Sequence, residues 1–210
     1  KGGKGNFRFS SSTNRAPRYA QPGLPGEEME VHLELRMLAD IGLIGQPNAG
    51  KSTLLKALTH ANPKIAAYPF TTLFPNLGLL RYVDQELVIA DIPGLLEGAS
   101  KGVGLGDQFL RHIDRTRLLV HLVSLEGSPD ECYKEFEVIT NELRKSHYKL
   151  LEKEKIVVLS KTDIIDGQQL SDYVSYFESH QINPLTISVY DAESLEKLKQ
   201  HIYRIYYETK

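Results

Sequence analysis

Residues 45–52 of the chain read Gly-Gln-Pro-Asn-Ala-Gly-Lys-Ser. This is the pattern Gly-x-x-x-x-Gly-Lys-Ser/Thr, in which glycines let the backbone curl until its N–H groups point at a phosphate. In that pattern Lys51 reaches the β- and γ-phosphates of a nucleotide, and the Ser52 hydroxyl binds Mg²⁺. The pattern carries this meaning only between a strand and a helix, so the flanking sequence decides whether it is a phosphate loop.

The flanking residues predict that setting. Asp40-Ile-Gly-Leu-Ile-Gly45 is typical of a buried strand, and residues 50–60 predict a helix with Leu54, Leu55 and Leu58 on one face. The N-terminus of this helix adds partial positive charge at the loop. We therefore interpret residues 45–52 as a nucleotide phosphate-binding loop.

Strand and helix patterns alternate along the rest of the chain. Further strands are predicted at 77–82, 87–90, 118–123, 156–159 and 185–187, the first two forming a hairpin across Asp84-Gln85. Ser128-Pro-Asp-Glu131 is a capping box that begins a helix with Cys132, Phe136, Ile139 and Leu143 on its apolar face. Asp191 is expected to cap a last helix, with Leu195, Leu198, Ile202 and Ile205 facing the core. This alternation predicts an α/β fold whose mostly parallel sheet is covered by helices on both faces, giving three layers.

Composition excludes several classes of protein. The chain has 210 residues, 41% hydrophobic and 25% charged, which excludes wholesale disorder. Its net charge of −2 does not mark the whole chain as a nucleic-acid binder, and a single cysteine excludes both a disulfide framework and a cysteine-rich zinc site. No apolar run approaches the ~18 residues that a membrane span needs. We expect a cytoplasmic monomer without a transmembrane segment.

Residues 1–26 differ in composition from the rest. They hold five of the sixteen glycines, three of the ten prolines and five basic residues, and they lack acidic residues. Two interpretations remain open: a solvated tail, or the edge of a domain that precedes this segment. We expect a division into residues 1–36 and a nucleotide-binding domain at 37–210.

Two further motifs follow predicted strands. Asp91-Ile-Pro-Gly94 comes after the strand at 87–90, where an acid can hold Mg²⁺ through water and a glycine N–H can contact a γ-phosphate. Ser160-Lys-Thr-Asp163 comes after the strand at 156–159. A carboxylate at Asp163 can accept hydrogen bonds from the N1–H and 2-amino groups of guanine, which adenine does not offer, while the stem of Lys161 covers the base plane.

In this order the motifs resemble a Ras-type GTPase, and more narrowly the Obg family. The resemblance rests on Gly45–Ser52 together with Tyr68-Pro-Phe-Thr-Thr-Leu73, Asp91-Ile-Pro-Gly-Leu-Leu-Glu-Gly-Ala99 and Gly104-Leu-Gly-Asp-Gln-Phe-Leu-Arg-His112. Phe9-Ser-Ser-Ser-Thr-Asn-Arg-Ala-Pro-Arg18 resembles the end of the Gly-rich N-terminal domain of that family.

The resemblance implies a P-loop G domain that uses Mg²⁺ to hydrolyse GTP to GDP and phosphate. It also implies a switch in large ribosomal subunit assembly and in the stress response, with the large subunit or its RNA, GTP, GDP and ppGpp as partners. Lys51, Thr72 and Gly94 would be catalytic, and Ser52, Thr72 and, through water, Asp91 would hold Mg²⁺. The implied GTP-binding residues are Gly45, Gln46, Pro47, Asn48, Ala49, Gly50, Lys51, Ser52, Phe70, Thr71, Thr72, Leu73, Asp91, Ile92, Pro93, Gly94, Ser160, Lys161, Thr162, Asp163, Ser188, Val189 and Tyr190.

This chain departs from the family pattern at two positions, and from Ras-type enzymes at a third. Ser160 replaces the usual Asn, and because Ser is shorter we expect it not to brace the phosphate loop, which weakens affinity. Tyr190 is unusual in the Ser188-Val-Tyr190 segment, whose backbone N–H groups are expected at guanine O6. Leu95 occupies the place of the water-orienting glutamine of Ras-type enzymes, so unaided hydrolysis is expected to be slow.

Asn48 leaves two interpretations open. Its side-chain oxygen could bind K⁺ beside the α- and γ-phosphates, as in some relatives of the Obg family with Pro-Asn in this loop, or it could only stabilise the loop by hydrogen bonding. For the whole chain the alternative to an enzyme is a nucleotide-gated RNA or ribosome adaptor with negligible hydrolysis. An ATPase is disfavoured by Asp163.

Overall fold

The computed structural model describes residues 1–31, 39–59, 64–65, 76–92, 116–145 and 153–208. The chain divides into two compact units, Lys1–Arg36 and Met37–Lys210. Each unit is described by itself below.

The second unit is built on a seven-stranded sheet. In spatial order its strands are β2 (Lys64–Ile65), β3 (Asn76–Tyr82), β4 (Gln85–Asp91), β1 (Ile41–Gly45), β5 (Leu118–Ser124), β6 (Glu154–Ser160) and β7 (Leu185–Thr186). The pairs β4–β1, β1–β5, β5–β6 and β6–β7 are parallel, whereas β2–β3 and the β3–β4 hairpin are antiparallel. The predicted hairpin and the mostly parallel sheet are therefore confirmed.

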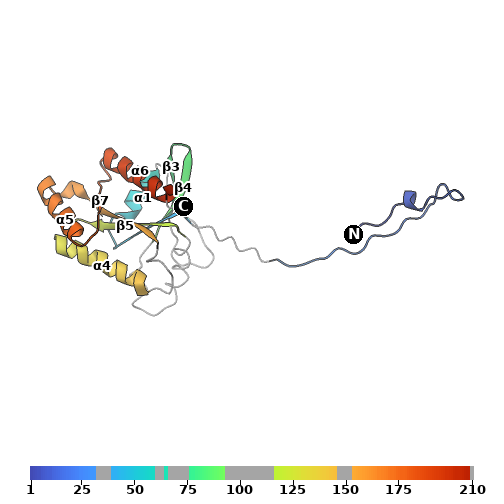
Figure 1. Cartoon of the computed structure of the whole chain (residues 1–210), viewed down its shortest axis with the longest axis horizontal. Helices are drawn as coiled ribbons and strands as arrows, with labels where there is room; N and C mark the ends of the chain where they lie inside the picture. Colours follow the sequence, from blue (N-terminus) through green and yellow to red (C-terminus); the bar gives the residue numbers. More distant parts are fainter. Residues whose placement is uncertain (32–38, 60–63, 66–75, 93–115, 146–152, 209–210) are drawn as a thin grey trace. The chain divides into compact units, whose positions relative to one another are not determined.

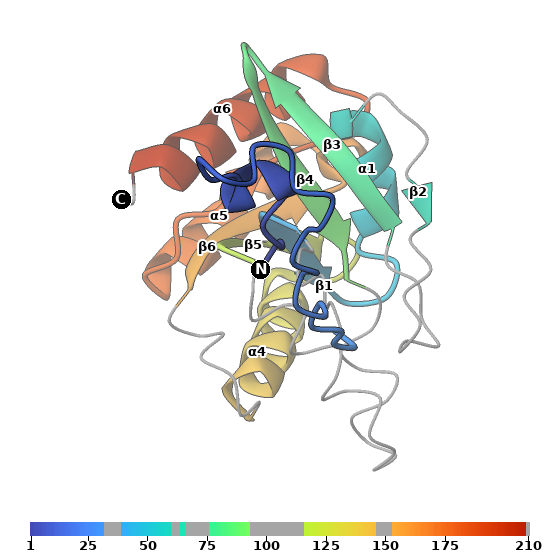
Figure 2. The same ribbon diagram turned by 90° about the vertical axis from the view of Figure 1, so that its right-hand side faces the viewer.

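Helices cover both faces of this sheet (Figure 1). The described α-helices are α1 (Lys51–Thr59), α4 (Pro129–Lys145), α5 (Gly167–Ser179) and α6 (Ala192–Glu208). On one face α1 and α6 pack with Leu54, Leu198 and Ile202 against the central strands. On the other face α4 contributes Ile139 and Leu143, and α5 contributes Phe177. Figure 2 shows α1 against the β3–β4 hairpin. The three-layer α/β/α fold predicted from the sequence is thus confirmed.

The predicted helix faces agree with the structure, and one helix was not predicted. Cys132, Ile139 and Leu143 are buried on α4, which begins at the expected capping box because Glu131 accepts from the Ser128 N–H at 2.8 Å. The missed helix is α5, whose start is fixed by a second capping box between Asp166 and Gln169. The sequence holds both signals for this helix, the capping box and apolar residues at helical spacing: Leu170, Tyr173, Val174 and Phe177.

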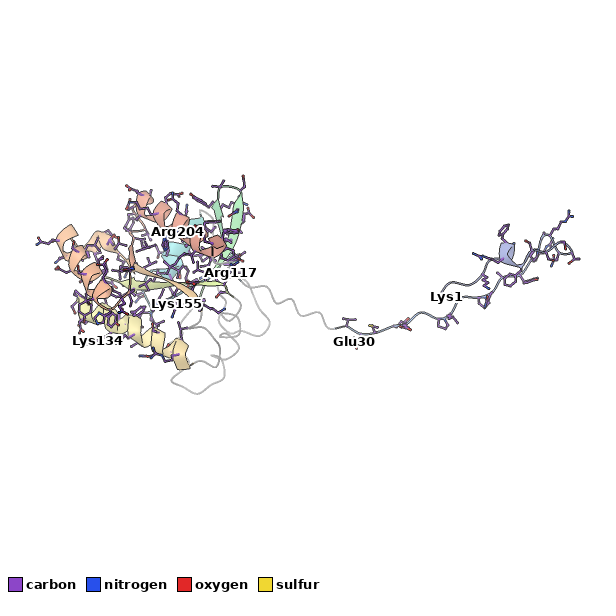
Figure 3. All side chains as sticks on the ribbon, in the orientation of Figure 1. Lys1, Glu30, Arg117, Lys134, Lys155 and Arg204 are labelled. Atoms are coloured by element: carbon purple, nitrogen blue, oxygen red, sulfur yellow. The ribbon has the colours of Figure 1, made fainter. Side chains whose placement is uncertain are left out.

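Tyrosines fasten α6 to the sheet. The buried Tyr203 hydroxyl lies 2.8 Å from the carbonyl oxygen of Leu80 and 3.0 Å from that of Gln85, both on the β3–β4 hairpin, and donates to one of them at a time. The Tyr206 hydroxyl donates to Asp40 Oδ1 at 2.7 Å, just before β1. The guanidinium of Arg117, labelled in Figure 3, lies 4.9 Å from the centre of the Tyr206 ring. Burial raises the pKa values of both tyrosines to about 12, so both hydroxyls stay protonated donors at neutral pH.

The first unit folds back on itself. Gln21 N–H donates to the Lys4 carbonyl at 2.9 Å, and Leu24 N–H donates to the Lys1 carbonyl at 3.1 Å. The rings of Phe9 and Tyr19 lie 5.3 Å apart, next to the short 3₁₀ turn η1 (Asn6–Phe9). Within this unit, residues 1–24 therefore form a loop whose two arms are hydrogen-bonded to each other.

Among the helices that the structure describes, none is both long enough and apolar enough to cross a membrane.

Tyr203→Phe should destabilise the second unit by about 1–2 kcal/mol, because it removes a buried hydroxyl that donates to one of two neighbouring carbonyl oxygens. Tyr207→Phe is the matched control on the same helix, since Tyr207 is more exposed and its hydroxyl makes no hydrogen bond among the described residues, and it should change stability by less than about 0.5 kcal/mol. Urea unfolding followed by circular dichroism measures both. Equal stability losses would show that the Tyr203 hydroxyl does not fasten α6.

Candidate functional site

The carboxyl ends of three parallel strands bring the predicted motifs to one edge of the sheet. β1 ends at Gly45, β4 at Asp91 and β6 at Ser160. Leu43 of β1 pairs with Asp91 of β4. Ser124 of β5, the strand between β1 and β6, pairs with Ser160 of β6. Loops at this edge of an open α/β sheet are where ligands bind in such folds.

The phosphate loop follows β1 and has the backbone that its glycines permit. Gly45 has φ +151°, and a Cβ there would lie 2.4 Å from the Leu122 carbonyl oxygen of β5. Gly50 has φ +92°, a conformation that strains any side-chain-bearing residue. Asn48 takes a left-handed conformation with φ 63°, which Asn tolerates better than most residues. These requirements explain why Gly and Asn stand at these positions.

Lys51, the first residue of α1, bonds back to the loop. Its Nζ donates to the carbonyl oxygens of Gly45 at 3.0 Å and Gln46 at 2.9 Å, and the residue is 9% exposed. The ammonium group is therefore held within the loop, at the N-terminus of α1, where the helix dipole also favours an anion. Gln46, Pro47 and Asn48 are at least partly exposed, whereas Ala49 is buried.

Ser52 and Asp91 form an oxygen pair between α1 and β4. The Ser52 hydroxyl donates to Asp91 Oδ2. Asp91 is 4% exposed, and its other oxygen, Oδ1, has no hydrogen-bond partner among the described residues. A buried carboxylate oxygen without a partner is costly unless a cation or water satisfies it. A hydroxyl beside a carboxylate is the hard-oxygen donor set that Mg²⁺ prefers, so these residues fit that ion.

Ser160 corrects one expectation from the sequence. We expected that Ser, being shorter than Asn, would not brace the phosphate loop. The buried Ser160 hydroxyl in fact donates to the Ala49 carbonyl oxygen at 2.8 Å and lies 3.2 Å from the Val123 carbonyl oxygen. The shorter side chain reaches because β6 ends directly beside the loop. Since a hydroxyl has one proton, it serves one carbonyl at a time.

A pocket of about 210 Å³ lies beside this brace. Its lining comes from the phosphate loop, α1, the strand ends and the last two motifs: Gly50, Thr53, Leu54, Leu122, Ser160, Lys161, Asp163, Ile187, Val189 and Tyr190. Asp163, in the 3₁₀ turn η3 (Thr162–Ile164), accepts a 2.6 Å hydrogen bond at Oδ1 from the Ser188 hydroxyl. This bond orients one carboxylate within an otherwise largely apolar pocket.

Backbone amides of the Ser188–Tyr190 segment differ in their partners. The Ser188 N–H donates to Ser194 Oγ at 3.3 Å, and the Tyr190 N–H donates to Ser188 Oγ at 3.2 Å. The Val189 N–H has no partner among the described residues. The Tyr190 ring is 86% exposed at the rim of the pocket. Val189 is therefore the amide of this segment that is available to a ligand.

Glu126 also lies at this edge of the sheet, and it was not predicted as a site residue. Its Oε2 lies 2.8 Å from Lys161 Nζ and accepts from the Ser124 hydroxyl at 3.0 Å. The signal available in the sequence was its place three residues after the end of the strand predicted at 118–123, whose carboxyl end lies at the site.

The structure does not bring every predicted site residue to this edge. The side chain of Ile92 packs in the core with Ile44 and Leu119, and its N–H donates to the Leu43 carbonyl at 3.1 Å. Thr162 lies in η3, but it does not line the pocket. Phe70, Thr71, Thr72, Leu73, Pro93, Gly94 and Leu95 lie outside the described residues.

Comparisons with known proteins agree with this geometry. A family profile described as 50S ribosome-binding GTPase matches residues 40–161, and one described as GTP1/OBG matches residues 1–37. The chain is 59% identical over 169 residues to GTPase Obg of Flavobacterium johnsoniae, which covers 80% of this chain and 50% of that protein. It is 48% identical over 211 residues to GTPase Obg of Aquifex aeolicus, which covers 99% of this chain and 62% of that protein. The chain thus spans about half to three fifths of the length of these relatives.

Solved structures share the fold at low sequence identity. Era of Aquifex aeolicus bound to GDP.AlF4- has a TM-score of 0.56 at 22% identity, covering 80% of this chain and 56% of that one. The G domain of the T. maritima FeoB iron transporter has a TM-score of 0.56 at 21% identity, covering 78% of this chain and 96% of that one. At these identities the likeness supports the fold alone. The family profiles and the curated relatives together show that the chain belongs to the 50S ribosome-binding GTPase family, within its Obg group.

Proposed function

We propose that the chain is a GTPase domain that binds GTP and, with Mg²⁺, hydrolyses it to GDP and phosphate. The observation that carries this proposal is the placement of three parts at one edge of the sheet. They are the phosphate loop closed by Lys51, the Ser52–Asp91 oxygen pair, and a base-sized pocket that holds Asp163. The family profile supports the same activity.

Each part has one task in the proposed reaction. Lys51 exchanges its carbonyl partners for β- and γ-phosphate oxygens, and the loop amides with the α1 N-terminus stabilise the negative charge that develops there. Asp163, oriented by Ser188, accepts from the N1–H and 2-amino groups of guanine, and the Val189 amide donates to guanine O6. When bound, Mg²⁺ would neutralise charge on the β- and γ-phosphates, held by Ser52 directly and by Asp91 through water. Thr72 and Gly94 are proposed to complete the γ-phosphate site.

The proposed biological role is that of a nucleotide-dependent switch in large ribosomal subunit assembly. The family description and the relatives named GTPase Obg support it. The match of residues 1–37 to the GTP1/OBG profile supports the proposal that residues 1–36 are the end of an N-terminal domain of that type. The alarmone ppGpp shares its guanine and 5′-diphosphate with GDP, so the same loop and pocket are proposed to accept it. A monomer in the cytoplasm is the proposed state.

Asp163→Asn should weaken GTP affinity by roughly 10- to 100-fold, because it removes a charged acceptor from two guanine donors. Xanthosine triphosphate should bind more tightly to the variant than to the parent, since xanthine offers an acceptor where guanine offers a donor. Competition titrations with both nucleotides measure this exchange. Asp172→Asn, an exposed change on α5, is the control. An unchanged preference between the two nucleotides would contradict the base-recognition role of Asp163.

Ser160→Ala should weaken GDP affinity by about 2- to 10-fold, because it removes the hydroxyl that holds the Ala49 carbonyl of the phosphate loop. Ser160→Asn should retain the brace and bind GDP as tightly as the parent. Ser171→Ala, whose hydroxyl donates to the Gly167 carbonyl within α5, serves as control. Equilibrium titration with a fluorescent GDP analogue measures all four chains. If Ser160→Ala binds GDP like the parent, the brace does not contribute to the site.

Hydrolysis should be faster in KCl than in NaCl at equal ionic strength if Asn48 binds K⁺ beside the phosphates. Asn48→Gly should abolish the difference, and it is a better test than Asn48→Ala because Gly accepts the left-handed backbone at this position. Single-turnover phosphate release in the two salts measures the effect. Equal rates for the parent would leave Asn48 as a loop-stabilising residue only. No phosphate release in either salt, with GTP bound, would favour a nucleotide-gated adaptor instead of an enzyme.

A further inference from the structure

We propose that Glu126 is a positioning residue for base recognition: it fixes the Lys161 ammonium group, so that the aliphatic stem of Lys161 forms a preset wall of the base pocket. The inference rests on the proposed guanine-nucleotide binding and adds a residue from the loop after β5 to that site. Three observations carry it: the backbone that brings the two residues together, the shared contacts of the Glu126 carboxylate, and the place of Lys161 in the pocket.

The ends of two neighbouring strands bring Glu126 and Lys161 side by side. Ser124 and Ser160 are register partners at the ends of β5 and β6. One residue farther along, the Leu125 N–H donates to the Ser160 carbonyl at 3.2 Å, which ties the loop after β5 to the end of β6. Glu126 directly follows Leu125 and Lys161 directly follows Ser160, so the two residues lie just beyond this hydrogen bond. Their proximity is therefore built into the sheet.

The Glu126 carboxylate is held from two sides. Its Oε2 lies 2.8 Å from Lys161 Nζ and also accepts from the Ser124 hydroxyl at 3.0 Å. The hydrogen bond from Lys161, and to a smaller extent the one from Ser124, lowers the pKa of Glu126. The carboxylate therefore stays ionised at neutral pH. An anchored carboxylate limits the positions that a lysine ammonium can adopt.

Lys161 lines the base pocket while its ammonium is engaged by Glu126. Its side chain is 27% exposed, whereas that of Glu126 is 58% exposed. Its backbone is left-handed, with φ 64° and ψ 39°, so β6 ends abruptly there. A long side chain normally loses rotamer freedom when a ligand packs against it. With the ammonium fixed beforehand, that loss is smaller, and the methylene groups offer a ready surface to a planar base.

Glu126→Gln is the test, because it keeps the size of the side chain and removes its charge. The positioning role predicts that GDP binds about two- to fivefold more weakly to the variant, in line with the coupling of an exposed ion pair. A purely long-range electrostatic effect predicts the opposite sign, since removing a negative charge near the site favours an anionic nucleotide. Glu137→Gln, the same change at an exposed position of α4, measures that background. Thermal unfolding of the variant should stay within about 2 °C of the parent, because the pair is exposed.

Two further arms separate positioning through Lys161 from other roles. In a Lys161→Met background, which retains the stem but lacks the ammonium, Glu126→Gln should have no additional effect on GDP affinity. The penalty of Glu126→Gln should be the same for inosine diphosphate as for GDP, because the wall contacts the base plane and the 2-amino group is at its edge.

Each arm has a result that overturns the proposal. GDP affinity equal to or tighter than that of the Glu137→Gln control would exclude positioning by Glu126. An undiminished penalty in the Lys161→Met background would show that Glu126 acts without Lys161, and a penalty confined to GDP would place its action at the base edge. If the parent chain binds no guanine nucleotide, the proposed function fails. If the parent binds GDP and Glu126→Gln is silent, only this inference fails.

Discussion

The hydrogen bond from the Ser160 hydroxyl to the Ala49 carbonyl joins the two parts of the site, which are 111 residues apart in sequence. The phosphate loop follows β1 and the turn that we propose recognises the base follows β6, so no local structure links the two. The parallel register of the intervening strand aligns their ends, and the brace then links loop to turn. The spacing of the strands therefore sets the spacing of the two recognition elements.

Charge is distributed over this edge according to what each ligand group needs. Lys51 and the α1 N-terminus provide positive potential at the phosphate loop, whereas Asp91 places a buried carboxylate next to Ser52. The unpartnered Asp91 oxygen is a cost to the isolated fold that a bound cation or water would offset. At the other end, Asp163 and Lys161 each have a fixed partner, Ser188 and Glu126 respectively. Both charged groups of the proposed base pocket thus have a fixed partner, whereas Asp91 Oδ1 has none among the described residues.

The sequence predicted most of the fold because local and long-range signals agree there. A clear apolar pattern is combined with a cap or a glycine turn in four elements: the strand before the phosphate loop, α1, α4 and α6. α5 was not predicted although the sequence carries both of its signals, the capping box of Asp166 with Gln169 and the helical spacing of Leu170, Tyr173, Val174 and Phe177. The brace by Ser160 could not be read from residue size, since it depends on how close β6 ends to the loop. Glu126 was missed for the same reason: its partner becomes its neighbour only through strand pairing.

We propose that this edge of the sheet is one guanine-nucleotide site with a place for Mg²⁺. Equilibrium titration of the chain with GTP, GDP and ATP, each with Mg²⁺ and with EDTA, tests it most directly. GTP and GDP should bind more than about 100-fold more tightly than ATP, because adenine leaves Asp163 without its donors. Mg²⁺ should also strengthen GTP binding, since the ion satisfies Asp91 and the phosphates together. Equal affinity for ATP and GTP, or GTP binding that is indifferent to Mg²⁺, would contradict the proposal.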